Sequence, residues 1–276
     1  MLNLAAEDMH CFACGGPLKT IHSEDHYEVV CCSDCGLTHV MPLPTTESAV
    51  ELYEDDPVIH FSHGRECVLA AFLRQAEAIL GGPGRLLDIG CGAGTFLDFA
   101  RRNGWQVSGV DINAAAIRSA RENFQLDIRR GTIRDVSGSF DLITFMQAIE
   151  YMSDSHEDMF ARTAHLLTED GLLGVETPNM NFHHLLLRFR AARSFDIAIR
   201  LAPDETSRLI AYTPTAITHL LRKAGFRDVS IRPGLPRQTG GAEGLIRNAL
   251  YRGSSFLYWI NHTWVISPTM FVFARK

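Results

Sequence analysis

The stretch LLDIGCGAG, residues 86–94, decides the fold of this chain. An apolar run ends at Asp88 and Ile89, and a glycine-rich turn follows before a helical pattern of apolar residues at positions 96, 97 and 99. A second apolar run, residues 107–110, ends in another acid, Asp111. Strand, glycine turn, helix and strand in this order form the first half of a nucleotide-binding parallel sheet. The glycines allow the backbone to approach a ligand without interference from a Cβ atom.

The spacing of these residues narrows the choice of ligand. The glycines fall at positions 90, 92 and 94, whereas dinucleotide sites use the register G-x-G-x-x-G. A carboxylate at Asp88 would repel a pyrophosphate but would favour a cationic group, and Asp111 lies where an acid accepts from both ribose hydroxyls. The residues therefore indicate an adenosine that carries positive charge and no phosphate, S-adenosylmethionine (SAM), and disfavour a nicotinamide oxidoreductase.

Further motifs extend this pattern along the chain. FDLITFM at 140–146 resembles the fourth strand of the class I SAM-dependent methyltransferases, GLLGVETPN at 171–179 resembles their fifth, and LLRKAGF at 220–226 resembles the helix before the sixth. The resemblance covers residues 84–232 and a terminal strand near 268–276. It implies an α/β fold, a Rossmann-like doubly wound sheet, and SAM as cofactor. The expected cofactor-binding residues are Asp88 at the amino group of SAM, Gly90 and Gly92 under its methionine portion, Asp111 on the ribose, Ile112 on the adenine and Gln147 at the methionine end.

Two C-x-x-C-G knuckles lie near the N-terminus, with Cys11 and Cys14 in the first and Cys32 and Cys35 in the second. Tetrahedral zinc takes four thiolates from two such turns and leaves no open coordination position. Two disulfides are the alternative, which a reducing compartment disfavours. We expect a structural zinc ribbon.

The chain divides into three parts by composition. The zinc ribbon spans 1–42, a linker with N-terminal helices spans 43–83, and the methyltransferase domain spans 84–276, with insertions at 179–212 and 233–267. Because loops at the carboxyl ends of parallel strands surround the ligand, we interpret both insertions as lids over the acceptor.

The catalytic candidates follow the fourth and fifth strands. Many relatives carry Glu-His after the fourth strand, and some place a further acid three residues earlier to bind Mg²⁺; here Gln147 and Tyr151 replace that acid and the His. We therefore expect transfer to oxygen without Mg²⁺. His183, or failing it His184, is the expected proton acceptor, and Tyr151 is expected to position the hydroxyl.

Charge in the insertions suggests the kind of acceptor. The first insertion is rich in arginine, and the second combines arginines with Tyr251, Phe256, Tyr258, Trp259 and Trp264. A solvated helix face explains such patterns as well. The functional interpretation is a small-molecule or lipid-linked glycan acceptor of anionic character, or peripheral contact of the second lid with a membrane surface. The ribbon followed by a Pro-Leu-Pro connector resembles methyltransferases of sugar and glycan pathways, which makes O-methylation of a glycan intermediate the leading hypothesis.

Two other functions remain open from the sequence. One is methylation of a quinone-like or other aromatic small molecule, and the other is an RNA-modifying or RNA-binding protein that uses the ribbon. The net charge of −6 and the single lysine among many acids in the ribbon make nucleic acid an unfavourable partner. The cysteine usage and the lack of a long apolar run lead us to expect a cytoplasmic protein, peripheral at most at the inner face of the membrane.

Overall fold

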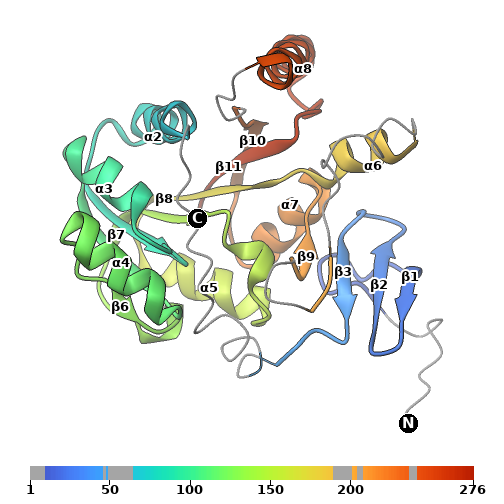
Figure 1. Ribbon diagram of the computed structural model, residues 1–276, viewed down its shortest axis with the longest axis horizontal. Helices are drawn as coiled ribbons and strands as arrows, with labels where there is room; N and C mark the ends of the chain where they lie inside the picture. The colour runs from blue at the N-terminus through green and yellow to red at the C-terminus, as the bar shows by residue number, and fades with distance from the viewer. Residues whose placement is uncertain (1–9, 46–47, 49–64, 189–200, 204–207, 236–240) are drawn as a thin grey trace.

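The computed structural model describes residues 10–45, 48, 65–188, 201–203, 208–235 and 241–276. Its larger sheet has seven strands in the order β10-β11-β8-β7-β4-β5-β6 (Figure 1). Only β11 is antiparallel to its neighbours, so the six other strands run the same way. The strands are β4 (Arg85–Ile89), β5 (Gln106–Asp111), β6 (Arg129–Arg130), β7 (Phe140–Met146), β8 (Leu167–Pro178), β10 (Asp228–Pro233) and β11 (Thr269–Arg275).

Helices cover both faces of this sheet, which confirms the doubly wound fold. One face carries α2 (Glu66–Leu80), α3 (Thr95–Arg102) and α4 (Ala114–Phe124), and the other carries α5 (His156–Leu166) and α7 (Pro214–Lys223). On the first face, the Phe72 ring packs edge-on against Phe96 and Phe271, with centroids 5.9 and 5.2 Å away. Local chemistry starts α7, because Pro214 occupies its first turn and the Thr213 hydroxyl accepts from the Ala216 amide at 3.0 Å.

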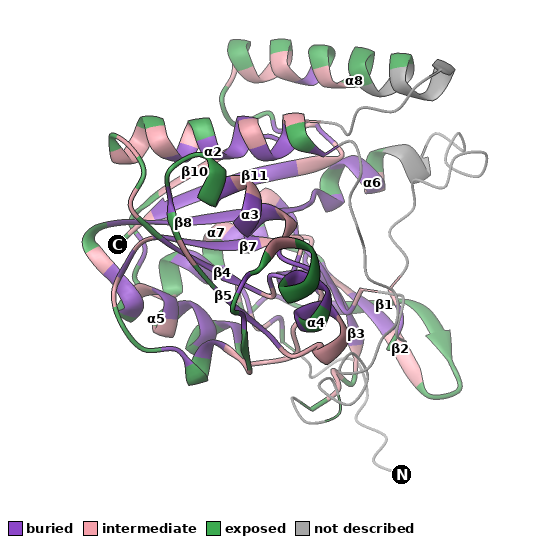
Figure 2. Cartoon of the chain, turned by 60° about the vertical axis from the view of Figure 1, so that its left-hand side comes forward, coloured by how far each residue is buried: buried purple, intermediate pink, exposed green. Residues whose placement is uncertain are grey.

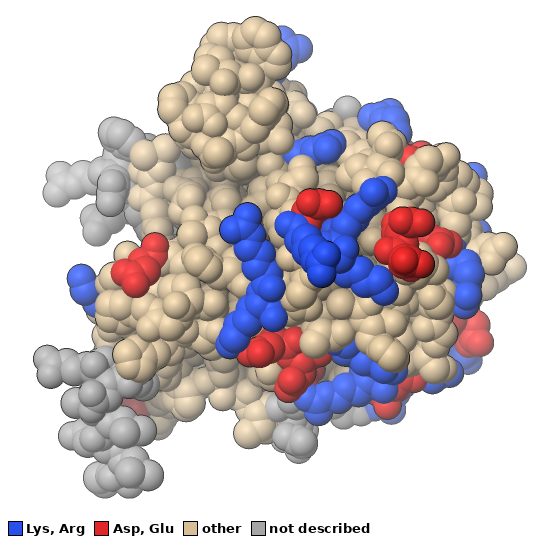
Figure 3. Space-filling model, turned by 180° about the vertical axis from the view of Figure 1, so that it is seen from behind, with Lys and Arg blue, Asp and Glu red and all other residues tan. Residues whose placement is uncertain are grey.

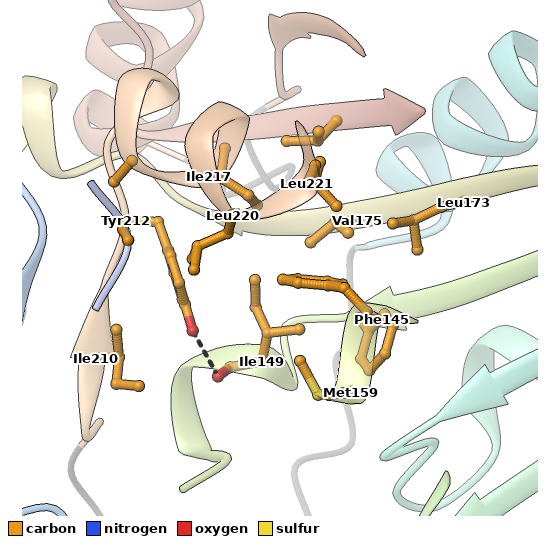
Figure 4. Close-up of a cluster of buried hydrophobic side chains, with 14 of the residues drawn as sticks. Phe145, Ile149, Met159, Leu173, Val175, Ile210, Tyr212, Ile217, Leu220 and Leu221 are labelled. Carbon is orange, nitrogen blue, oxygen red and sulfur yellow. Dashed lines mark hydrogen bonds between the residues drawn. The ribbon is translucent and has the colours of Figure 1, made fainter. Parts of the chain in front are cut away.

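The cysteine-rich N-terminal region forms a second, four-stranded antiparallel sheet. Its strands are β1 (Leu18–Glu24), β2 (Tyr27–Cys32), β3 (Thr38–Met41) and β9 (Ile210–Ala211). The last strand comes from the first insertion, so the two sheets share one hydrophobic core (Figure 4). Tyr212 points into this core from the end of β9, and its hydroxyl donates to the Ile149 carbonyl at 3.1 Å.

The two insertions contain structure that the sequence analysis did not specify. The first begins with α6 (Met180–Arg188) and ends with β9, and the second contains α8 (Gly241–Ile260). The strand β6, at the other edge of the large sheet, is only two residues long. Within the described part of the chain, no helix is both long and apolar enough to cross a membrane.

Candidate active site and metal centre

The expected cofactor residues gather at the carboxyl edge of the sheet, where β4, β5 and β7 end. The turn after β4 is tight: Gly90 has φ +67°, and a Cβ there would lie 2.8 Å from the Ala148 Cβ atom. Gly92 has φ +53°, and its amide donates to Asp111 Oδ2 at 2.6 Å. The Asn113 amide donates to Asp111 Oδ1 at 2.8 Å. Glycine is therefore required at position 90 for the positive φ and for the close approach of Ala148, and at position 92 for the positive φ.

These two amides hold the Asp111 carboxylate in one orientation at the end of β5. Burial raises its pKa, and the backbone amide hydrogen bonds oppose that shift. Each carboxylate oxygen keeps a second lone pair for another donor. Ile112 follows directly and is half-buried. This arrangement suits a ligand that presents two neighbouring hydroxyl groups.

Asp88 lies deeper, at the mouth of the glycine turn. Its Oδ1 accepts from the Thr144 hydroxyl at 2.7 Å, across the β4–β7 pair. Burial raises the pKa of the Asp88 carboxyl to about 8. A cationic group beside it would reverse that shift, because an opposite charge favours the ionised carboxylate.

A charged and polar cluster closes the same end of the site. The Gln147 amide donates from Nε2 to Glu176 Oε1 at 3.1 Å, and its Oε1 lies 3.5 Å from Arg65 Nη1. Arg65 also forms an ion pair with Glu176, and both side chains are nearly fully buried. Gln147 has φ +58°, which is uncommon for a residue other than glycine. The hydrogen bond from its backbone amide to the Glu176 backbone carbonyl at 2.8 Å holds that conformation. Sequence reasoning missed Arg65 because it lies far from every motif.

A second buried cluster lies beside the first, where β7 and β8 end. Glu150, in the short helix η3 (Ile149–Tyr151), accepts from the Thr177 hydroxyl through Oε2 at 3.2 Å. Its Oε1 lies 3.7 Å from Arg208 Nε. Burial raises the pKa of Glu150 to about 7, although the positive charge of Arg208 opposes that shift. The Arg208 guanidinium also lies over the Tyr151 ring, 5.7 Å from its centroid.

The histidines differ in their surroundings. His183 is buried on α6, one turn beyond the end of β8, and its ring packs edge-on against Phe182 at 5.7 Å. His184 is half-buried and His219 is exposed. His156 begins α5 and is buried; its Nε2 hydrogen-bonds Tyr212, and burial lowers its pKa to about 4. A buried His that contacts apolar rings stays neutral, which its position in the sequence did not reveal.

The four predicted cysteine ligands come together in the small sheet. All four sulfur atoms lie within 4.8 Å of one another, with 3.6 Å between Cys11 and Cys35 and 3.5 Å between Cys14 and Cys32. Four sulfurs placed about 2.3 Å from one zinc ion at tetrahedral angles are about 3.8 Å apart, so the spacing fits zinc. Burial raises the pKa of Cys11 to about 11 and that of Cys35 further, a cost that a bound cation removes.

The small sheet also holds the segment that carries Arg208. Val40 of β3 donates its amide to the Leu209 carbonyl at 2.9 Å, and the Leu209 amide donates to the Glu150 carbonyl at 2.8 Å. The Thr213 hydroxyl donates to the Cys35 carbonyl at 2.5 Å. The cysteine cluster is thus linked by short hydrogen bonds to the residues beside Glu150.

Comparison with known proteins agrees with this geometry. The family model for a methyltransferase domain matches residues 61–231, so the chain belongs to that methyltransferase family. Together with the fold, this membership identifies it as a SAM-dependent methyltransferase of class I. A SAM-dependent methyltransferase from Archaeoglobus fulgidus has the same fold, with a TM-score of 0.50 and 20% identity over 77% of this chain and 94% of that one.

Curated relatives match shorter parts of the chain. A ubiquinone biosynthesis O-methyltransferase of Caulobacter sp. (strain K31) is 32% identical over 173 residues, which cover 55% of this chain and 68% of the relative. A ribosomal RNA small subunit methyltransferase C of Alcanivorax borkumensis is 43% identical over 75 residues, which cover 26% of this chain and 23% of the relative. The chain therefore spans less than a quarter of one relative and about two thirds of the other.

Proposed function

We propose that this methyltransferase transfers a methyl group to a hydroxyl of a quinone-like aromatic small molecule. The observation that carries the proposal is the gap between Glu150 Oε1 and Arg208 Nε. The two atoms are buried 3.7 Å apart, and among the described residues neither has a hydrogen-bond partner. A hydroxyl between them donates to the carboxylate and accepts from the guanidinium, which satisfies both groups.

This pair has the chemistry that an O-methyl transfer needs. The pKa of Glu150, about 7, suits a general base near neutral pH. A phenolic hydroxyl has a pKa near 10 in water, and the positive charge of Arg208 stabilises the developing phenolate. Bound SAM supplies the electrophilic methyl group. The acceptor oxygen forms a bond to the methyl carbon while the bond between that carbon and the sulfur of SAM breaks. Glu150 keeps the proton of the acceptor hydroxyl.

Two observations favour an aromatic acceptor. Curated relatives are named ubiquinone biosynthesis O-methyltransferases, and the Caulobacter relative matches over most of its length. Tyr151 lies under Arg208, so an aromatic ring beside the pair would meet a flat apolar surface. The glycan hypothesis rests on the ribbon and its Pro-Leu-Pro connector and on the arginines of the insertions, of which those at 190, 193 and 200 lie outside the described residues.

The cofactor roles assigned from the sequence remain part of the proposal, supported by the geometry. Asp111 would accept from the ribose hydroxyls, with Ile112 against the adenine. Gly90 and Gly92 would lie under the methionine portion, Asp88 would face its ammonium group, and Gln147 would line its end. Zinc at Cys11, Cys14, Cys32 and Cys35 would have a structural role, because four protein thiolates fill its coordination shell.

An acceptor comparison tests the proposal. The full chain is incubated with SAM that carries an isotope-labelled methyl group and either an alkylated catechol or UDP-glucose, and the products are analysed by mass spectrometry. We expect one labelled methyl group on a catechol oxygen and none on the nucleotide sugar. If UDP-glucose acquired the labelled methyl group and the catechol did not, the result would favour the glycan hypothesis and contradict this proposal.

A further inference from the structure

The long helix α8 is anchored at the reactive edge of the large sheet. The chain leaves the sheet after Pro233, at the carboxyl end of β10, and returns to it at Thr269, with α8 between these two points. Asn179, next to the end of β8, donates its backbone amide to the Pro268 carbonyl at 2.9 Å and its side-chain amide to the Val265 carbonyl at 2.8 Å. The segment after the helix is therefore held at the edge at which we place methyl transfer, and α8 itself packs against the edge strand β10.

The exposed face of α8 carries large apolar side chains, unlike that of an ordinary surface helix. The outer face of α8, which we define as Leu245, Ala249, Phe256, Trp259 and Ile260, is exposed at each of these positions (Figure 2). These positions follow spacings of four, seven and four residues, so they share one face. Leu245 is 74% exposed, Phe256 59% and Trp259 73%. The opposite face carries Ser254, which is buried, and Tyr258, which packs against the hydrophobic core.

Charge and aromatic content around this face are also unusual. The sequence from 244 to 276 contains no acidic residue, although the chain has 32, and its basic residues include Arg247 and Arg252. Figure 3 shows α8 as a largely uncharged protrusion with a basic side chain at its rim and no acidic one in view. The rings of Phe256 and Trp259 stack with centroids 6.2 Å apart, and Trp264 is exposed just beyond the helix.

We propose that the outer face of α8 lies in the interfacial layer of an anionic phospholipid bilayer. Tryptophan and phenylalanine favour the headgroup region, and helices that lie in this layer combine such an apolar face with basic residues. Arg252 is exposed and supplies a positive charge for the anionic headgroups. The inference goes beyond the proposed function, because bilayer binding requires neither SAM nor an acceptor. It would also bring the reactive edge to the surface where apolar acceptors dissolve.

The size of the face argues against a second copy of the chain as its partner. A helix of 20 residues is about 30 Å long and about 10 Å wide, so its outer face offers roughly 300 Å². Stable protein interfaces bury about 800 Å² on each partner. A bilayer has no such minimum area, since apolar side chains and charge contribute separately to binding.

Co-sedimentation with vesicles tests the proposal. The full chain is mixed with vesicles of phosphatidylcholine alone or with added phosphatidylglycerol. We expect binding to the mixed vesicles, together with a blue shift of tryptophan fluorescence from Trp259 and Trp264, since the third tryptophan, Trp105, is already buried. Phe256→Ser with Trp259→Ser should reduce the partition coefficient at least about tenfold.

Matched variants separate the contributions. Arg252→Glu should weaken binding to the mixed vesicles only, and Ile21→Ser, an exposed apolar residue of β1, should bind as the wild type does. Wild type that stays in the supernatant, or a double variant that binds unchanged, would overturn the proposal. A dimer in light scattering that the double variant dissociates would assign the face to a second copy instead and would also overturn it.

Discussion

Asp111→Ala is the substitution that tests the cofactor site most sharply. The carboxylate is held by the amides of Gly92 and Asn113 at 2.6 and 2.8 Å, so it is oriented before the ligand arrives. Removal of a charged acceptor for two hydroxyls costs about 3 kcal/mol, which corresponds to roughly a hundredfold weaker SAM binding. Asp111→Asn keeps the shape and one acceptor oxygen, so we expect an intermediate loss of about tenfold.

Isothermal titration calorimetry with SAM measures this loss. Circular dichroism should show that each variant is folded, because the two backbone amides also lose their acceptor. Asp127→Ala is the matched control, since the Asp127 side chain is 98% exposed and its carboxylate faces Arg121 at 3.6 Å. An Asp111→Ala protein that binds SAM as tightly as the Asp127→Ala control would refute the placement of the ribose.

Four further predictions concern the zinc, the absence of a Mg²⁺ requirement, the histidines and acid stability. Metal analysis should find about one zinc per chain, and Cys14→Ser should lose it and destabilise the small sheet; a folded, metal-free wild type would contradict the zinc site. Activity should survive EDTA under conditions that leave the zinc bound, whereas restoration by added Mg²⁺ would show a divalent cofactor. His183→Ala with His184→Ala tests the competing base: full activity removes both histidines as proton acceptors. The pKa of His156 is lowered from 6.5 to about 4 in the folded protein, so protons bind the unfolded state preferentially between these pH values. The free energy of unfolding should therefore fall by about 3 kcal/mol as the pH drops from 6.5 to 4. Chemical denaturation should show a smaller fall in His156→Gln, and an equal fall would refute the assignment.

The sequence predicted the features that depend on local chemistry. The glycine turn at 90–94 and the acid at Asp111 could be placed because a turn that needs positive φ and a strand that ends in an acid leave a direct trace in the chain. The cysteine cluster was predicted for the same reason, since both halves of the site are short local motifs.

Features that depend on long-range packing left no such trace. The strand β9 joins the small sheet from about 170 residues away, and only the fold brings Arg208 next to Glu150. Arg65 reaches Glu176 across 111 positions in the sequence. The burial of His156 and the outward apolar face of α8 follow from tertiary contacts, which residue type and periodicity do not encode.

The pH dependence of methyl transfer by wild type and Glu150→Gln tests the central claim most directly. The rate of transfer to an alkylated catechol is measured in single turnovers from pH 5 to pH 9, a window chosen to span the pKa of a base poised near neutrality. Because a general base must be ionised, the wild-type rate should rise with pH through an inflection at about 7. Glu150→Gln should lower the rate by about a hundredfold or more and abolish the inflection while SAM binding is unchanged. A Glu150→Gln protein that keeps the wild-type rate and inflection would contradict the account.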